Sequence, residues 1–565
     1  MKMRTKETTM FSNTKRSGWR FVTICIMVMI ILTSLPYVFG YVISPSDKVF
    51  MGIITNTPDI AQYFAWMKGF ETANLIDNHL TPEPSAAVFF NLLWWTLGKL
   101  TAILPVSPMV MIQSYRFLSI IAFSVIAYWF IGLFVPEQSQ RRATFLVACF
   151  GGGLGWIWVV AKYTFAHGEL LFPRDLYVVE PNTFQCMMGI NHFTISAALM
   201  ILIYGLFVVG YERRQWRYPL LASLVALLLG WEHAYDLLLV YAVIGVFALI
   251  LFLRDGFSWH LVLYPMAIGL VSGWAALYSV YITRAFPVWK AVLAQFDNAG
   301  AWTPALPHLL ILLGLPFVVA LFAFDGLVPL RERSVRDLFI RVWFGINLFM
   351  VYVPLNFQIH YLNGWQVPIA ILATGAFFER ILPWVRRQSL FQRLGKSWSH
   401  VCLERGLVAT ALLAIVLVNI YIFAWRFVVL ARLPHDRFLE RDEVAALDWL
   451  AQNAEQDDIV LCASEVGQYV PSRVGARAFL AHWAMTKDLY EKQRMVQEFF
   501  DTETPDSDRQ AIIQEFSVDY VLLGVEERAI GDYDPGQAGY LEPCFKSPKA
   551  TVYCVQERQL AQVKR

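Results

Sequence analysis

Long runs of apolar residues, separated by short polar connections, dominate this chain. A helix needs about 20 mostly apolar residues to cross a bilayer, so each long run is a candidate membrane span. The first run, residues 21–46, contains no Asp, Glu, Lys or Arg. The apolar core of a cleaved signal has only about 7–15 residues, so we interpret this run as an anchoring span. The other candidate spans are residues 108–134, 143–165, 188–211, 218–236, 237–253, 258–283, 304–324, 337–354, 364–380 and 406–430.

The positive charges of the connections predict the sidedness of these spans. The N-terminus and the connections 135–142, 211–217, 254–259, 325–337 and 380–405 together hold 21 Lys and Arg residues. The connections 44–85, 166–187, 284–303 and 355–363 together hold only 5. Cytoplasmic connections carry the excess of Lys and Arg. The N-terminus, residues 1–20, is therefore expected to be cytoplasmic, and the second group faces outward.

The apolar run 86–104 does not fit this scheme as a simple crossing. The connection 44–85 is expected outside and 135–142 inside, so an odd number of crossings must separate them. Two apolar runs lie between them, 86–104 and 108–134. We therefore place 86–104 in the outer interface or as a re-entrant helix. The fold class predicted is a polytopic α-helical membrane protein with about 11 crossings and one such helix.

Composition separates the apolar part of the chain from its C-terminal tail. The 565 residues are 57% hydrophobic and only 16% charged, compared with roughly 25% charged in soluble domains. Residues 437–565 hold 14 basic and 23 acidic residues, whereas the rest of the chain holds 32 basic and 21 acidic ones. No basic stripe suggests a nucleic-acid partner. We predict a membrane domain over 21–430, with an outer loop 44–85, and a soluble domain over 431–565.

The tail alternates predicted helices and strands, which is typical of a small α/β domain. Helices are expected over 441–453, 484–500 and 507–516, and strands over 459–462, 520–523 and 551–555. Cys544 and Cys554 could face each other on neighbouring strands, and an oxidising compartment would permit a disulfide. We nevertheless expect free thiols. Candidates for a ligand surface, or for a cap that steadies the outer loops, are Glu465, Tyr469, Arg473, His482 and Trp483.

The first outer loop contains the leading catalytic candidate, Asp59. Pro58 can open a helix and places Asp59 in its first turn, where an acidic residue complements the helix dipole. Tyr63, Trp66 and Met67 follow on one side, as in a helix that lies in the membrane interface. The spacing alone leaves a structural and a catalytic role for Asp59 equally open. Glu83, held between two prolines, is a weaker candidate, since a structural turn explains it as well.

A second group of polar residues lies at the outer end of a short span. Residues 218–231 give only 14 uncharged residues, about 21 Å of helix, so the residues that follow should dip into the outer leaflet. Glu232 and Asp236 would share a helix face if the helix continued, with His233 beside them. They could bind a divalent metal ion or form an internal hydrogen-bonded knot. His360 lies in another outer connection.

The positions of Asp59 and the tail resemble the GT-C superfamily of glycosyltransferases, which use polyprenyl-phosphate sugars and include protein mannosyltransferases and aminoarabinose transferases. The motif of this resemblance is an acidic residue just after the first span. The stretches that carry it are Pro58-Asp59-Ile60-Ala61-Gln62-Tyr63-Phe64, Pro82-Glu83-Pro84, residues 89–100 and 118–142, and Ala446-Leu447-Asp448-Trp449-Leu450 at the start of the tail. The chain departs from the commoner pattern at Glu83, where many members have a basic or small residue.

The resemblance implies an inverting transferase of the cell membrane whose tail is periplasmic or extracellular. Its partners would be a polyprenyl-phosphate-linked sugar, the lipid bilayer, and an acceptor lipid, protein or glycan. Asp59 would act as the general base on the acceptor hydroxyl. Arg284 or Lys290 would meet the donor phosphate, although most exposed cations serve only solubility. The phosphate is already a leaving group, so a metal need not be obligatory, and a divalent metal at Glu232 and Asp236 stays open.

Two other classes of protein fit the same residues. Carboxylates, histidines and arginines at membrane depth would also suit a proton-coupled transporter or a lipid flippase. Such carriers often show internal repeats, and we find no duplicated half in this sequence. In a non-catalytic protein of envelope assembly, Asp59 would be structural.

Overall fold

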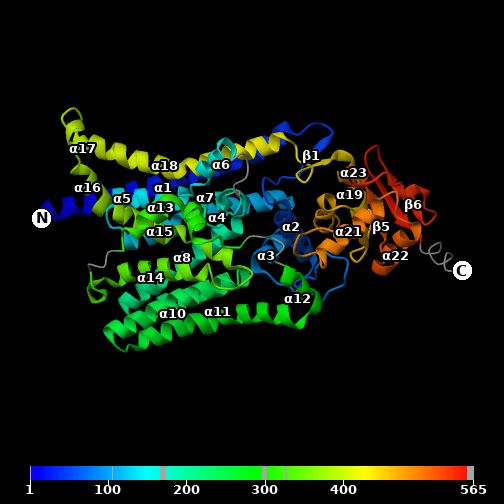
Figure 1. The fold of residues 1–565 in the computed structure, drawn as a ribbon. Coiled ribbons are helices and arrows are strands. Elements are labelled where there is room, and N and C mark those ends of the chain that lie inside the picture. Colours follow the sequence, from blue (N-terminus) through cyan, green and yellow to red (C-terminus); the bar gives the residue numbers. More distant parts are fainter. Residues whose placement is uncertain (1, 105, 166–172, 296–301, 325–327, 557–565) are drawn as a thin grey trace. The chain divides into compact units, whose positions relative to one another are not determined.

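The chain folds into two compact units, each assembled from segments far apart in sequence. The structure, a computed structural model, describes residues 2–104, 106–165, 173–295, 302–324 and 328–556 (Figure 1). Unit 1 comprises residues 1–35, 115–277 and 301–425, and unit 2 comprises 36–114, 278–300 and 426–565. These units divide the chain differently from the predicted domains, since the first outer loop and the tail fall within the same unit. The boundary predicted between a membrane domain and a soluble domain after residue 430 stays a prediction.

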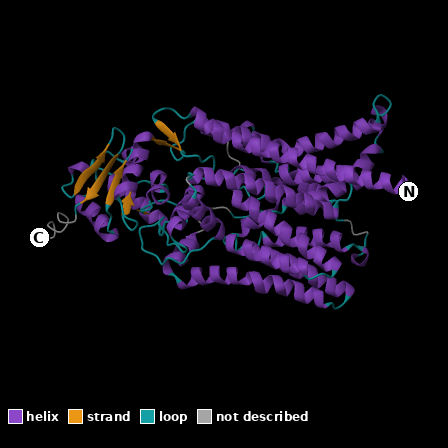
Figure 2. Cartoon of the chain, turned by 180° about the vertical axis from the view of Figure 1, so that it is seen from behind, coloured by secondary structure: helices purple, strands orange, loops and turns teal. Residues whose placement is uncertain are grey.

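Helices dominate the described part of the chain (Figure 2). The expected spans coincide with helices. Among the described residues, seven helices are long and apolar enough to cross a membrane, or eight if the bent pair α5 and α6 is one span. α9, α13 and α14 have 16 residues each, which is short for a bilayer core of about 30 Å. The helices at the expected spans are α1 (Lys2–Ile43), α4 (Pro108–Phe134), α5 (Gln138–Phe150) with α6 (Gly155–Thr164), α8 (Asn191–Arg213), α9 (Arg217–Glu232), α10 (Asp236–Asp255), α11 (Trp259–Ala285), α13 (Leu306–Leu321), α14 (Val335–Met350), α15 (Gln366–Ala376) and α18 (His400–Ala431).

Unit 1 has one continuous apolar core, to which α4, α8, α10, α14 and α15 contribute fully buried side chains. Shorter helices connect the long ones: α7 (Thr183–Gly189), α16 (Leu382–Arg386) and α17 (Ser389–Leu394). Arg116, inside the apolar run of α4, is 1% exposed and donates hydrogen bonds to the hydroxyls of Thr33 and Ser34 of α1. Its charge is thus accommodated by hydroxyl acceptors within the helix packing rather than by reaching the interface.

The glycine-rich segment 151–155 allows close helix packing at an interruption between helices. α5 ends at Phe150, α6 begins at Gly155, and the two are bent by 47°. A side chain at Gly151 would clash with the amide of Gln366, and one at Gly152 with Val418. Only glycine lets these neighbours approach the backbone so closely.

Unit 2 combines the first outer loop with the tail. α2 (Thr57–Thr72) packs against α3 (Leu92–Ile103), whose 12 residues are too few to cross a bilayer. β1 (Lys48–Phe50) pairs antiparallel with β2 (Phe438–Glu440), so the loop and the tail share hydrogen bonds as well as an apolar core. The placement of residues 86–104 in the outer interface, or as a re-entrant helix, stays a prediction. The helix α12 (Pro287–Ala294), from the segment 278–300, also belongs to this unit.

The tail contains the predicted α/β domain. Its five-stranded sheet has the order β4-β3-β5-β7-β6, with β3 parallel to β4 and β5, and β7 antiparallel to β5 and β6. The strands are β3 (Ile459–Leu461), β4 (Arg477–Ala478), β5 (Tyr520–Leu523), β6 (Leu541–Lys546) and β7 (Thr551–Val555). The helices are α19 (Arg441–Asn453), α20 (Ser464–Gly467), α21 (Leu489–Phe500), α22 (Asp506–Phe516) and α23 (Val525–Ile530).

Cys544 and Cys554 form a disulfide, so the expectation of free thiols was wrong. Both cysteines lie on the hairpin β6–β7, where Cys554 pairs in register with Glu542. Antiparallel pairing places their Cα atoms 5.9 Å apart, which is the usual spacing of a disulfide. The two cysteines thus lie on neighbouring strands, as the sequence suggested, and the pairing of these strands brings them within the distance of a disulfide.

Candidate functional site

Asp59 lies in the first turn of α2, as predicted. The preceding residue Asn56 adopts a left-handed conformation with φ of 48°, and Pro58 occupies one of the first helical positions. The Asn56 amide donates a hydrogen bond to Asp59 Oδ2. The side chain of Asp59 is 22% exposed, so solvent or a ligand can reach it.

Two tail residues, His482 and Trp483, donate hydrogen bonds to the same carboxylate. His482 Nε2 and Trp483 Nε1 each lie 2.9 Å from Asp59 Oδ1. His482 Nδ1 accepts hydrogen bonds from the backbone N–H groups of Ala484 and Met485, at 3.0 and 3.1 Å. Because Nδ1 serves as an acceptor, the proton of the ring belongs on Nε2, which donates to Asp59. The backbone therefore fixes the tautomer of His482 that suits Asp59.

This environment makes Asp59 an ionised carboxylate at neutral pH. Burial raises the pKa of Asp59, but the hydrogen bonds from His482, Trp483 and Asn56 outweigh it, and the pKa lies below the ordinary value. Three donors meet a group that has about four acceptor positions. The arrangement can thus hold a negative charge and still accept one further hydrogen bond, for example from a substrate hydroxyl.

Glu83 anchors the first loop to the tail. Its Oε1 lies 2.6 Å from Nζ of Lys492, a lysine of α21 that is 2% exposed, and its Oε2 accepts from Thr81 Oγ1. A buried ammonium needs such a partner, because an unpaired charge in the interior is strongly destabilising. Through this contact Glu83 stabilises the packing of the first loop on the tail. A catalytic role for Glu83 stays a prediction.

Arg284 and Lys290 lie at the end of α11 and on α12, in unit 2. Both residues are exposed, and neither forms an ion pair or a side-chain hydrogen bond with another described residue. Trp289 between them is 1% exposed and fixes α12 by donating a hydrogen bond to Ala86 O. Exposed cations of this kind are available to an anionic ligand, and binding of a donor phosphate stays a prediction.

The second group of candidates gathers in unit 1. Glu232 ends α9 and Asp236 begins α10, so the helix does not continue and the expected shared face was wrong. The reason is His233, whose φ of −137° and ψ of 74° break the helix. His233 Nδ1 lies 3.1 Å from Asp236 Oδ2, and Glu232 lies 3.5 Å from the hydroxyl of Tyr115.

His360 joins this group through stacked rings. Its Nδ1 lies 2.6 Å from Glu180 Oε1, and its ring stacks on Tyr235 with centroids 5.1 Å apart. The Tyr235 ring lies 4.8 Å from that of His233, which in turn lies 4.8 Å from His192. The structure thus brings Glu232, His233, Asp236 and His360 together, as polar contacts at helix ends. Asp59, Glu83, Arg284 and Lys290 all belong to the other unit.

A metal site at Glu232 and Asp236 gains no support from the geometry. Among the described residues, the group whose ligand atoms could share one ion is Asp77, His79 and Asp457, in unit 2. Arg477 already forms ion pairs with Asp77 and Asp457 there. A guanidinium that bridges both carboxylates neutralises the charge on which a cation would depend.

Comparisons with known proteins show similarity at the level of structure. No protein-family model matches the sequence, and no curated protein matches it. The oligosaccharyltransferase of Archaeoglobus fulgidus in its apo form is 12% identical, with a TM-score of 0.53 over 94% of this chain and 74% of its own. The same enzyme, AglB, bound to an inhibitory peptide and a dolichol-phosphate, gives a TM-score of 0.51 at 12% identity over 89% and 69% of the two chains.

A bacterial protein is similar over nearly its full length. ArnT from Cupriavidus metallidurans, bound to undecaprenyl phosphate, is 12% identical, with a TM-score of 0.50 over 95% of this chain and 98% of its own. The chain shares the overall fold of the Archaeoglobus fulgidus oligosaccharyltransferase and of ArnT.

Proposed function

We propose that this protein transfers a sugar from a polyprenyl-phosphate donor to an acceptor on the outer face of the membrane. The observation that carries the proposal is the Asp59 carboxylate in the first turn of α2, held by His482 and Trp483 within a GT-C fold. The similar structures hold a dolichol-phosphate and undecaprenyl phosphate, which are lipids of the class we propose as donor carriers.

Asp59 acts as the general base in this proposal. The acceptor hydroxyl donates its hydrogen bond to Asp59, and its oxygen attacks the anomeric carbon. The bond from that carbon to the phosphate oxygen breaks, the phosphate leaves with the electron pair, and the configuration inverts. The acceptor proton passes to Asp59. An ionised carboxylate with a low pKa is a weak base. It is best suited to a reaction in which the bond to the leaving group breaks early and the acceptor hydroxyl becomes acidic only as its oxygen bonds to the anomeric carbon.

The donor phosphate meets Arg284 or Lys290 in this proposal. Both are exposed cations of unit 2, the unit that also contains Asp59. Charge-assisted hydrogen bonds to phosphate are about twice as strong as neutral ones, so even one of these residues would help stabilise the leaving group. The phosphate is already a leaving group, so the proposed reaction does not require a metal ion, and a divalent metal at Glu232 and Asp236 stays a prediction.

The decisive experiment replaces Asp59 by Asn in purified membranes supplied with a lipid-linked sugar. Loss of a general base typically lowers the rate about 10²–10⁴-fold, so Asp59→Asn should lose nearly all sugar transfer. Asp47→Asn is a matched control, because Asp47 lies in the same loop with 58% of its side chain exposed. Unchanged transfer by a folded Asp59→Asn protein would overturn the assignment of the base and favour a scaffold in which Asp59 is structural.

A transporter is the second candidate, favoured by the interrupted helices of unit 1. α5 and α6 are separated by a bend of 47°, and Gly314 interrupts α13 with φ of 70°. Interrupted helices often form substrate and ion sites in carriers. Proton-driven uptake of a solute into proteoliposomes would establish this function, and its absence together with sugar transfer would exclude it.

A further inference from the structure

The two interrupted helices of unit 1 meet at their breaks. The extended segment between α5 and α6 contacts α13 just before Gly314, where the N–H of Leu154 donates a 2.8 Å hydrogen bond to Ile311 O. A side chain at Gly314 would lie 2.3 Å from Gly152 O, so the two backbones touch. Irregular backbone within a membrane domain is tolerated only where protein buries it or where it lines a cavity.

The break leaves carbonyl oxygens that a regular helix would use. Leu312 O would accept from the N–H four residues later, but residue 316 is a proline, which has none. A Cβ atom at Gly153 would lie 2.5 Å from Ile311 O, 2.7 Å from Leu312 O and 2.3 Å from Asp175 Oδ2. All three oxygens therefore lie close to one another, at the position where any other residue would place its side chain.

Asp175 adds an unpaired negative charge to these oxygens. Its side chain is 1% exposed, and its Oδ2 accepts a 2.8 Å hydrogen bond from the N–H of Gly155, the first residue of α6. Its Oδ1 has no hydrogen-bond partner among the described residues. Among the described residues, no cation lies close enough to Asp175 to influence its pKa.

Gln185 extends this excess of acceptors. Its amide Nε2 donates a 2.9 Å hydrogen bond to the backbone oxygen of Asp175, which orients the other amide atom. That atom, Oε1, is buried and also lacks a partner within the described ranges. Buried polar atoms are almost always paired, so the unpaired Oδ1 of Asp175 and Oε1 of Gln185 indicate a missing electropositive group. Burial also raises the pKa of Asp175, to about 7, as expected for a carboxylate without a cation.

We infer that the meeting point of the two breaks binds a small monovalent cation, of the size and charge of Na⁺. Asp175 supplies the one negative charge, and Gln185 Oε1 and Leu312 O supply neutral oxygens. A divalent ion such as Ca²⁺ takes six to eight oxygens, usually with several carboxylates, so a single carboxylate matches a monovalent ion better. Unwound carbonyls at broken helices coordinate Na⁺ in other membrane proteins. The inference does not depend on the proposed sugar transfer.

Thermal unfolding of the purified full-length protein in detergent tests this site. The melting temperature should rise with NaCl and saturate, while KCl and choline chloride at the same ionic strength should give a smaller, non-saturating change. A ligand that binds only the folded state raises its stability in this saturable way. Equal curves in the three salts would overturn the inference, and this comparison needs no variant.

Two variants connect the effect to the site. Asp175→Asn should abolish the difference between NaCl and choline chloride, and bound ²²Na⁺ in equilibrium dialysis should fall to background. Asp236→Asn is the matched control, since Asp236 is also fully buried in unit 1 but is paired with His233. It should retain the Na⁺ effect. A Na⁺ effect that survives in Asp175→Asn, or disappears equally in both variants, would contradict the assignment.

Discussion

At the scale of single residues, the donors around Asp59 decide its charge and its strength as a base. Trp483 contributes one N–H to Asp59 Oδ1 and His482 another. The two are not equivalent, because His482 Nδ1 also satisfies two backbone N–H groups of the tail. Replacing His482 would leave those groups unpaired and would disturb the loop, whereas replacing Trp483 by Phe removes the N–H that donates to Asp59 and leaves both backbone groups paired.

Trp483→Phe should therefore shift the pH profile of sugar transfer. The indole N–H lowers the pKa of Asp59, so its loss raises that pKa and moves the acid limb of kcat/KM to higher pH. Activity on the neutral plateau should change much less. Trp449→Phe is the control, because Trp449 of α19 packs against Tyr520 and Phe545 elsewhere in the unit. A lower activity with an unmoved acid limb would show that Trp483 only supports the structure.

Sequence patterns singled out these residues separately but could not join them. Asp59 is marked by Pro58 and by its place after the first span, both local features. His482 is 423 positions away along the chain, and nothing in either segment specifies the other. Pairing at such a distance depends on how β1, β2 and the tail pack together, which periodicity does not encode. The boundary between the spans 218–236 and 237–253 was placed a few residues too late, because the polar residues 232–236 gave no sign that α9 ends at Glu232.

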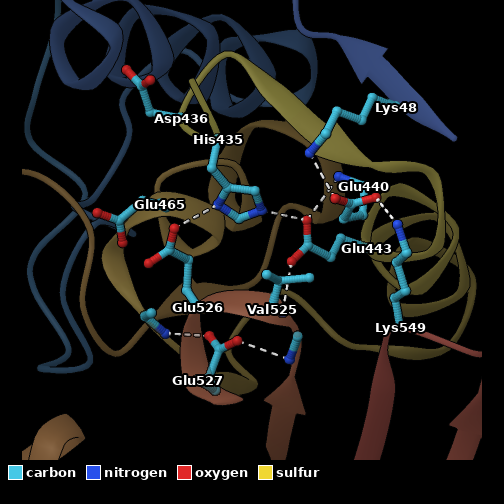
Figure 3. A network of polar contacts seen from close by, with 12 residues as sticks. Lys48, His435, Asp436, Glu440, Glu443, Glu465, Val525, Glu526, Glu527 and Lys549 are labelled. Carbon is cyan, nitrogen blue, oxygen red and sulfur yellow. Dashed lines mark hydrogen bonds and ion pairs between the residues drawn. The ribbon is translucent and has the colours of Figure 1, made fainter. Parts of the chain in front are cut away.

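At the scale of elements, a polar network joins the linker after α18 to the tail (Figure 3). His435 Nε2 lies 2.7 Å from Glu443 Oε2, and its Nδ1 lies 3.0 Å from Glu526 Oε1. Glu443 is 0% exposed and also accepts from the N–H groups of Glu440 and Val525. Burial lowers the pKa of His435, but the two carboxylates outweigh it, so that pKa lies above the ordinary value of 6.5.

This network should make stability depend on pH. A histidine whose pKa is raised by folding stabilises the folded state below its unfolded pKa and loses that effect as pH rises through the folded value. His435→Gln should therefore lower stability by about 1–3 kcal/mol at mildly acidic pH, with the difference vanishing at alkaline pH. The measurement is the melting temperature of both proteins across pH. A difference that is constant with pH would show that packing, not charge, is responsible.

Elements were predictable wherever their pattern is local. The helix predicted over 441–453 and the strands over 520–523 and 551–555 have the bounds of α19, β5 and β7. Each has a strong periodicity and clear ends, so neighbouring residues suffice to define it. Gly314 is the contrary case, because the apolar pattern continues on both sides of it although its backbone leaves the helical region. Its φ of 70° is fixed by contact with Gly152, which lies in another segment.

At the scale of the whole molecule, two independent features point to the same sidedness. Positive charges gather in one set of connections, which predicts the cytoplasmic face. The disulfide Cys544–Cys554 lies in the tail, and disulfides persist in oxidising compartments outside the cytoplasm. The connection 380–405, assigned to the cytoplasm, contains Cys402, an exposed free cysteine. The other free cysteines of the described chain are buried: Cys25, Cys149, Cys186 and Cys462.

This distribution makes the natural cysteines a test of orientation. A membrane-impermeant maleimide should not label the wild-type protein in intact cells, and should label it after permeabilisation, at Cys402. The variant Ser472→Cys, partly exposed between α20 and β4 of the tail, should be labelled in intact cells, because the positive charges of the connections predict that the tail faces outward. Cys402→Ser is the control, which should remain unlabelled under both conditions. Labelling of Cys402 from outside, or of Ser472→Cys only after permeabilisation, would reverse the orientation and would place Asp59 and the tail in the cytoplasm.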